Sequence, residues 1–313
     1  MPLTVDIGQH SSAFITEQRM ADRTGLGLAL ISVVVAGLFF IGCKEDPTKS
    51  GGSGFHPRYK IETEPTRTLD GQYIYYIATD TLNLGNSGVF RAEIDKPIRE
   101  LVLAGEDLHS PTLAPDNNRL AYLNGGIIEY YNLSTQAVDT SSIDREFSSI
   151  VYLNDTLLVG RANMSIYIVN EVRGTLINVG NGWHPSVVTQ DTFTYTAPRH
   201  GLNDVVVKRD ASLTVNDTLL TLPLESTWRT ILWPGGDPSS DRWVWVRSSN
   251  NGLALHAVQL QPYVDRMLDS TMSEKALLLG PDKIIFTSFD GRFYETDWAG
   301  SDPFPWWYQE PND

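Results

Sequence analysis

Six side chains precede or open short apolar segments in successive β-rich parts of the chain, and they combine aromatic rings with hydrogen-bonding groups. They are His109, Arg145, Trp183, His184, Trp228 and Arg229. Groups of this kind hold a peptide or a sugar when they converge in one concave place. Alternatively, these histidines and tryptophans brace contacts between neighbouring units. We expect them to form a ligand-binding site if the fold brings their segments together.

The motifs of several enzyme classes are missing from the sequence. It has no Gly-x-Ser-x-Gly nucleophile turn, no His-Glu-x-x-His, no paired cysteines and no phosphate-binding glycine loop. We therefore expect no catalytic residue, no metal and no cofactor. One alternative stays open, a surface carbohydrate-active enzyme (a glycosidase or lyase), because its carboxylates can come from distant loops and need only lie about 5 to 10 Å apart.

Charge and cysteine content narrow the class of protein further. The formal net charge is -14, and no basic patch occurs, so the sequence argues against a nucleic-acid partner, which needs clustered Lys and Arg. The chain of 313 residues has one cysteine and thus no intrachain disulfide. Its 41% apolar residues suffice for a substantial core, which must rest on packing and hydrogen bonding.

The single cysteine, Cys43, follows an apolar run. Thr24–Gly42 holds nineteen residues without a charge, preceded by Arg19 and Arg23, as in an export signal. As a helix it would span roughly 28 Å, so an uncleaved membrane anchor is the alternative. Phe40-Ile41-Gly42-Cys43 resembles a bacterial lipobox, with Phe40 in place of the usual leucine. The resemblance implies that residues 1–42 are a lipoprotein signal peptide and that Cys43 is lipidated.

Two further features concern this N-terminal region. The first nineteen residues carry Asp6 and Glu17 and fit an export signal poorly, so Met20 is an alternative start. After the cysteine, Lys44-Glu45-Asp46 resembles the signal that sends lipoproteins of some Bacteroidota to the cell surface, and a charged linker is the alternative. Residues 43–55 are polar and glycine-rich and predict a flexible tether of about 17 to 20 Å.

These patterns together predict a lipid-anchored protein of the bacterial outer membrane that faces the periplasm or the cell surface. Several acyl chains at Cys43 would provide stable anchoring, which one chain cannot.

The rest of the chain, residues 56–313, contains a repeat. An aspartate precedes a β-rich run six times, at spacings of 46, 39, 36, 50 and 41 residues. The mean, about 42, is that of a four-stranded propeller blade. The six aspartates are Asp70, Asp116, Asp155, Asp191, Asp241 and Asp282.

Each repeat continues in the same way, with a turn rich in Gly, Asn or Ser and a second run of Val, Ile, Tyr, Phe and Trp. Short apolar segments such as 110–113 and 276–279 precede the aspartates, and we predict that they form the innermost strands. Each aspartate then lies in the hairpin between the first and second strands, where its carboxylate accepts hydrogen bonds from turn amides. No segment after Phe55 shows sustained helical periodicity. The sequence predicts an all-β, six-bladed propeller.

The stretch HSPTLAPDNNRLAYL, His109 to Leu123, resembles the repeat of TolB-like propellers, a WD-like repeat with Ser-Pro, Pro-Asp-Gly and a Leu-Ala-Phe type strand. Leu113 replaces the usual tryptophan and Asn117 the usual glycine. The resemblance covers roughly residues 58–308. It implies a disc with a central channel, used in that family for binding proteins or peptides or as a non-catalytic partner of other domains, so we expect an envelope protein, peptide or glycan as partner.

Two expectations concern the geometry of that disc. The loops that enter the innermost strands should gather the six candidate binding residues at one end of the channel. Arg58–Glu62 should close the ring by adding the outer strand to the last blade, because Pro303 and Pro305 interrupt the C-terminal segment and cannot donate to a ladder. Trp306-Trp307-Tyr308 should pack beneath the disc rather than form a carbohydrate platform.

Overall fold

The computed structural model describes residues 60–68, 70–80, 87–94, 96–199, 202–221, 228–237, 240–249, 252–270, 272–280, 282–288 and 290–306. The chain divides into two units, Met1–His56 and Pro57–Asp313, and all described residues belong to the second. The predicted signal peptide, Cys43 and the tether lie outside the described residues. None of the described elements is a helix long and apolar enough to cross a membrane.

Six four-stranded antiparallel sheets make up the second unit, each from four consecutive strands. Blade 1 contains β1 (Lys60–Arg67), β2 (Tyr73–Asp80), β3 (Gly88–Glu93) and β4 (Lys96–Ala104). Blade 2 contains β5 (Leu108–Leu113), β6 (Arg119–Asn124), β7 (Ile127–Asn132) and β8 (Val138–Thr140). Blade 3 contains β9 (Ser149–Tyr152), β10 (Leu157–Ala162), β11 (Ser165–Asn170) and β12 (Thr175–Asn181).

The remaining three sheets repeat this order. Blade 4 contains β13 (Trp183–Thr189), β14 (Thr192–Arg199), β15 (Leu202–Asp210) and β16 (Asn216–Thr221). Blade 5 contains β17 (Trp228–Asp237), β18 (Arg242–Ser249), β19 (Gly252–Leu260) and β20 (Tyr263–Asp269). Blade 6 contains β21 (Met272–Leu278), β22 (Lys283–Ser288), β23 (Phe293–Asp297) and β24 (Phe304–Pro305).

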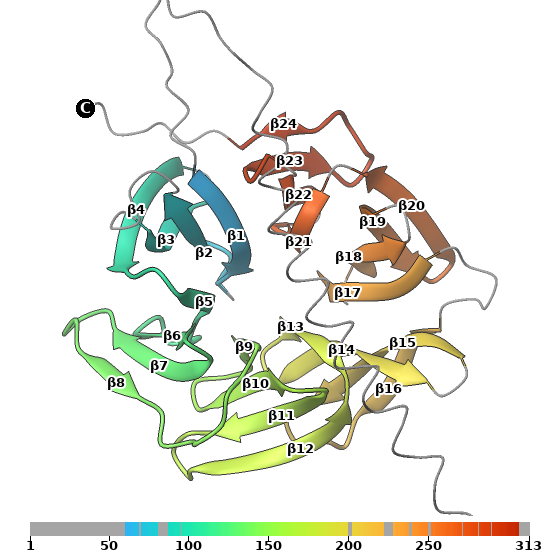
Figure 1. The fold of residues 1–313 in the computed structure, drawn as a ribbon. Coiled ribbons are helices and arrows are strands. Elements are labelled where there is room, and N and C mark those ends of the chain that lie inside the picture. Colours follow the sequence, from blue (N-terminus) through green and yellow to red (C-terminus); the bar gives the residue numbers. More distant parts are fainter. Residues whose placement is uncertain are drawn as a thin grey trace, which may run out of the picture. The chain divides into compact units, whose positions relative to one another are not determined.

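The sheets stand in a ring around a common axis (Figure 1). The first strand of each blade contacts the first strands of both neighbouring blades, so β1, β5, β9, β13, β17 and β21 line the axis. The prediction of an all-β propeller with six four-stranded blades is confirmed.

Burial along each blade follows from this stacking. The second strands are buried on both faces because a neighbouring sheet covers each side, so β2 and β22 are almost continuously buried. The outermost strands have one edge in water, and all three residues of β8 are exposed. Alternating apolar side chains of adjacent blades interdigitate to form the core between them.

Each described core cluster joins two neighbouring blades. For example, Val159 and Ile166 of blade 3 pack against Phe193 and Val205 of blade 4. Blades 1 and 6 share another cluster, in which Tyr76 meets Phe293 edge-on with ring centroids 5.1 Å apart. Because these interfaces have the same character around the ring, no blade is a separate domain.

The ring does not close by the predicted exchange of a strand, and that prediction is wrong. β1 is the innermost strand of blade 1, and the outer strand of blade 6 is its own β24, which pairs with β23 through Tyr294↔Pro305 and Glu295↔Phe304. Pro305 is tolerated because β24 is an edge strand, where a missing amide costs no central hydrogen bond.

The two terminal blades meet instead through direct contacts. The Glu62 amide donates a hydrogen bond of 2.7 Å to the Gly291 carbonyl, and Arg67 Nη1 donates one of 3.2 Å to the Leu278 carbonyl. Together with the shared core cluster, these bonds hold blade 1 against blade 6.

Trp306 of the C-terminal aromatic cluster packs in the core and not beneath the disc, where it was predicted. Its side chain is buried in the cluster between blades 1 and 6, 6.1 Å from the Phe293 ring centroid, and its amide donates to the Phe293 carbonyl. Trp307 and Tyr308 lie outside the described residues. Trp306 therefore fastens the end of the last blade to the core.

Candidate functional site

A cavity of about 370 Å³ lies at the axis, and residues from all six blades line it. Most of the lining comes from the second halves of the innermost strands, such as Thr66, Thr112, Val151 and Ser186. The cavity therefore extends toward the hairpins that follow these strands. A volume near 300 to 1,000 Å³ is typical of ligand pockets.

A β-bulge interrupts the innermost strand in most blades. Pairing between the first and second strands shifts register in β1, β5, β13, β17 and β21, and in the first four of these strands one shift passes over an Xaa-Pro pair. The pairs are Glu64-Pro65, Ser110-Pro111, His184-Pro185 and Trp233-Pro234. Proline has no amide hydrogen to donate, so it is accommodated where a bulge interrupts the ladder.

The bulges hold their first residues in an unusual backbone conformation. Glu64, Ser110 and His184 have φ angles of 52°, 48° and 54°, the left-handed region that residues other than glycine rarely adopt. Each such residue costs of order 1 to 3 kcal/mol, and residues of this type cluster at functional sites. Three of them around one channel mark this level of the axis as the candidate site.

Glu64 bridges blades 1 and 2 at this level. Its Oε2 accepts a hydrogen bond from the Ser110 amide at the bulge of β5, and its Oε1 lies 3.4 Å from His109 Nδ1. The bulge in β5 thus turns a backbone amide toward a carboxylate from the neighbouring blade.

His184 lies on the other side of the channel, close to two cationic groups. Burial, together with the positive charges of Arg161 and Lys275, lowers the pKa of His184 to about 3. Lys275 lines the cavity from blade 6, with its Nζ 3.5 Å from Thr66 Oγ1. The imidazole of His184 is therefore neutral near pH 7.

The recurring aspartates lie in the hairpins between first and second strands, as predicted, and Asp70 and Asp116 accept a hydrogen bond from an amide of their own turn. Asp70 Oδ1 accepts hydrogen bonds from Thr68 Oγ1 at 2.5 Å and from the Gln72 amide at 3.0 Å. Burial alone would raise the pKa of Asp70, but these bonds and one from Asn117 outweigh it and lower the pKa. The carboxylate thus stays ionised and holds the turn.

Several of these aspartates also link adjacent blades. Asn117 Nδ2 donates to Asp70 at 3.2 Å, the Asp116 amide donates to Asp155 at 2.9 Å, and Asn154 Nδ2 donates to Asp191 at 2.5 Å. The links join blades 1 and 2, 2 and 3, and 3 and 4. The sequence repeat therefore marks a chain of polar contacts between blades.

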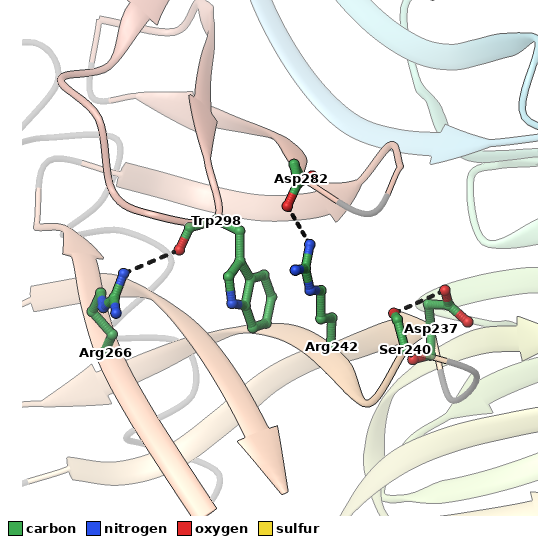
Figure 2. Close-up of polar contacts among 6 residues, drawn as sticks. All are labelled: Asp237, Ser240, Arg242, Arg266, Asp282 and Trp298. Atoms are coloured by element: carbon green, nitrogen blue, oxygen red, sulfur yellow. Dashed lines mark hydrogen bonds and ion pairs between the residues drawn. The ribbon is translucent and has the colours of Figure 1, made fainter.

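Blades 5 and 6 are linked by a salt bridge instead (Figure 2). Arg242 at the start of β18 reaches the carboxylate of Asp282, and its guanidinium lies 5.5 Å from the Trp298 ring centroid. Arg266 approaches the same segment from β20 and donates to the carbonyls of Trp298 and Ala299 at 3.4 and 2.8 Å. These contacts attach two turns of blade 6, at Asp282 and at Trp298, to blade 5.

A second polar cluster lies within blade 5, away from the axis. Asp265 on β20 forms a salt bridge with Arg247 on β18, lies 2.7 Å from His256 Nδ1 and accepts a 3.0 Å hydrogen bond from the Tyr263 hydroxyl. Burial alone would raise the pKa of Asp265, but hydrogen bonding with His256 and the charge of Arg247 outweigh it and lower the pKa. This cluster joins three strands of one blade.

The predicted binding residues occupy different places. His109 contacts Glu64, and Trp183 and His184 open β13 at the bulge. Arg145 does not join them, because its guanidinium stacks 4.5 Å from the ring centroid of Tyr167 on the third strand of blade 3. Trp228 and Arg229 begin β17, and their side chains lie outside the described residues.

Several residues of the candidate site escaped the sequence analysis. Glu64, Arg161 and Lys275 belong to it, and none was predicted. For Glu64 a signal exists, because Xaa-Pro precedes the blade aspartate by five to seven residues in four blades. For Arg161 and Lys275 the local sequence holds no such signal.

The chemistry of the cavity lining suits binding. Its charged residues are Arg67, Lys275 and Asp237, and the rest of the described lining is small, hydroxylic or aliphatic apart from Tyr152. Within the described part of the chain, no group of three His, Cys, Asp or Glu side chains could hold a metal ion.

No protein-family model and no curated protein sequence matches this chain. Solved structures do resemble it: TolB from Acinetobacter baumannii has a TM-score of 0.54 and 15% identity over 66% of this chain and 54% of that protein. A chain of a nidogen/laminin complex has a TM-score of 0.55 and 11% identity over 79% and 93%. An oligogalacturonate lyase from Vibrio parahaemolyticus has a TM-score of 0.52 and 11% identity over 76% and 78%.

These similarities establish a fold shared with TolB proteins. The alignment spans about half the length of the Acinetobacter TolB. Because a lyase has the same fold, the propeller by itself does not specify an activity.

Proposed function

We propose that this chain is a cell-envelope lipoprotein whose propeller is a non-catalytic binding module for a protein, peptide or glycan. The observation that carries the proposal is the axial cavity, about 370 Å³ in volume and lined by all six blades. A concave site with a mainly small and aliphatic lining and few charged groups is typical of ligand binding.

The composition of that lining also supports binding over hydrolysis or elimination of a glycan. Asp237 is the one carboxylate among the described residues that line the cavity. Glycosidases of the two-carboxylate type need a second acid about 5 to 10 Å away. The carbohydrate-active enzyme remains the second candidate because the similar Vibrio structure is a lyase.

The proposed attachment to the membrane rests on the sequence around Cys43. The apolar run before it, the resemblance to a lipobox and the glycine-rich segment after it support an outer-membrane lipoprotein that faces the periplasm or the cell surface. Metabolic labelling of the expressing bacterium with a palmitate analogue tests this directly. The full chain should incorporate label and a Cys43→Ser variant should not, whereas labelling of neither would refute lipidation.

Binding is tested with the full-length chain in detergent micelles on arrays of peptides and glycans, followed by mass spectrometry of the bound molecules. Retention of unchanged ligand supports the binding module. Conversion of a glycan to smaller products, abolished by Asp237→Asn, would instead establish the enzyme. Retention that survives blocking of the cavity by Ser186→Trp would place binding elsewhere and contradict the proposal.

A further inference from the structure

The charged residues that line the axial cavity all come from one side of the ring. Arg67 belongs to blade 1, Asp237 to blade 5 and Lys275 to blade 6. Blade 6 lies between the other two, because its inner strand β21 contacts both β1 and β17. Blades 2, 3 and 4 contribute no charged residue to the described lining. The cavity therefore has a charged wall and an uncharged wall.

Two contacts hold the cationic side chains at the boundary between blades 6 and 1. Lys275 Nζ lies 3.5 Å from Thr66 Oγ1, and Arg67 Nη1 donates a hydrogen bond of 3.2 Å to the Leu278 carbonyl. Each contact joins β21 to β1. A Cβ at Gly71 would lie 2.5 Å from Arg67 Nη2, so the guanidinium also packs over the turn after β1. The two cations therefore lie on the same stretch of the cavity wall.

The lining is cationic although the protein as a whole is acidic. Arg67 and Lys275 contribute +2 and Asp237 contributes -1, so the described lining has a formal net charge of +1, against -14 for the chain. Inside a protein the effective dielectric constant is lower than in water, which strengthens the attraction between opposite charges. A guanidinium also offers five N–H donors, of which the Leu278 carbonyl accepts one. The charged wall therefore suits an anionic ligand group.

The uncharged wall is mainly aliphatic. Its aliphatic residues are Leu113, Val151, Pro185, Val187 and Val188. An apolar ligand group that packs on these residues loses contact with water, which favours binding. The same wall includes the hydroxylic residues Thr112 and Ser186. Thr112 Oγ1 accepts a hydrogen bond of 3.0 Å from the Tyr152 amide and keeps its own hydrogen to donate. This wall therefore suits an aliphatic group next to a hydrogen-bond acceptor.

We propose that the axial cavity binds the C-terminal residue of a peptide. The terminal carboxylate lies against Arg67 and Lys275, an aliphatic side chain packs on the wall of blades 2 to 4, and the Thr112 hydroxyl donates to a backbone carbonyl. Capture of a C-terminal carboxylate is one of the recurring modes of peptide recognition. This inference rests on the proposed binding function and specifies the chemistry of the ligand.

A C-terminal residue matches the two walls better than other peptide carboxylates do. Its carboxylate and its side chain are attached to the same Cα atom, so one residue supplies both the anion and the aliphatic group. An Asp or Glu side chain supplies the anion alone, and the peptide chain on both sides of it would also need space. A cavity of about 370 Å³ at the axis accommodates the end of a chain more readily than its middle.

The test offers four pools of acetylated heptapeptides to the immobilised full-length chain in detergent and quantifies the retained peptides by mass spectrometry. The first pool ends in Leu, Ile or Val with a free carboxylate and contains no Asp or Glu. The second has the same sequences with amidated ends, the third ends in Ser, Asn or Gln with a free carboxylate, and the fourth is amidated and has internal Asp and Glu. We expect at least about tenfold greater retention of the first pool than of each other pool.

Two substitutions with opposite effects on charge assign the binding to the cavity. Lys275→Gln lowers the net charge of the lining from +1 to 0 and should reduce retention of the first pool by about tenfold or more. Asp237→Asn raises the net charge from +1 to +2 and should increase retention by about threefold or more. Damage to the fold would instead lower retention in both variants.

Two further variants serve as controls. Lys208→Gln removes the same charge as Lys275→Gln from β15, outside the cavity lining, and should change nothing. Lys275→Arg keeps the charge and should retain most of the binding, which separates loss of the cation from loss of packing. Thermal unfolding confirms that each variant is folded.

The outcomes separate this inference from the proposed function. Equal retention of the first pool and any other pool, or a change in the same direction for Lys275→Gln and Asp237→Asn, would overturn the C-terminal site while leaving a peptide-binding module. Binding of glycans alone would overturn the C-terminal site and leave a glycan-binding module. If neither peptides nor glycans bind, the proposed function fails as well.

Discussion

Replacing Asp265 by asparagine removes the charge that pairs with Arg247 inside blade 5. Arg247 and His256 are only 5% and 4% exposed, so neither can turn to water without opening the blade. Removal of one partner from a buried ion pair costs about 3 to 5 kcal/mol, because the remaining charge is uncompensated. The Asp265 side chain is 15% exposed and Tyr263 beside it is half exposed, so we expect the lower end, about 3 kcal/mol.

Scanning calorimetry or circular dichroism of the full-length chain in detergent measures this change. For a domain of this size, about 3 kcal/mol corresponds to a decrease in Tm of about 6 to 12 °C. Asp217→Asn, on the exposed strand β16, removes a carboxylate with no described salt bridge and should change the unfolding free energy by less than about 0.5 kcal/mol.

Two further measurements test the cause. Combining Asp265→Asn with Arg247→Met removes both charges and should recover much of the loss, because an apolar replacement of a buried pair is often neutral. The folded-state pKa of Asp265 is lowered, so its contribution is complete above the ordinary aspartate pKa of about 3.9 and is lost as the pH falls below that value. A single variant whose Tm stays within about 2 °C of the Asp217→Asn control would refute the reasoning.

Three other perturbations have defined outcomes. The pKa of His184 is about 3 in the folded protein and near 6.5 in the unfolded chain, so between these pH values only the unfolded chain binds the proton. The unfolding free energy therefore falls as the pH falls from 6 to 4, and His184→Gln should reduce this slope by up to about 1.4 kcal/mol per pH unit in urea titrations. Equal slopes for the two proteins would contradict this. Gly88→Ala would place Cβ 2.1 Å from the Leu103 carbonyl oxygen and should lower the unfolding free energy by about 3 kcal/mol or more. Gly125→Ala has open space around the new Cβ and should lower it by about 1 to 2 kcal/mol. A higher urea midpoint for Gly88→Ala than for Gly125→Ala would disprove this account. Trp306→Ala should lower the unfolding free energy by about 3 to 5 kcal/mol, and an unchanged urea midpoint would show that the tail does not secure blade 6.

The fold could be predicted because its signals are local and repeated. Alternation of apolar residues depends on neighbours along the strand, and an aspartate in a tight hairpin bonds to amides two residues away, as Asp70 does with Gln72. Six occurrences of this pattern, spaced as in the blades of a propeller, are compatible with few other architectures. The closure of the ring was mispredicted because Pro305 excludes a central strand but not a two-residue edge strand, and sequence alone does not distinguish the two.

The sequence alone indicated the strands, their grouping into blades except at the closure of the ring, and the turns that join them, since these depend on contacts over a few residues. Only the tertiary structure decided which side chains share the channel. Thr66, Ser186 and Lys275 are far apart in sequence, and they line one cavity because the ring brings their blades around one axis. The site therefore depends on the path of the whole chain, which the local sequence around each of these residues does not encode.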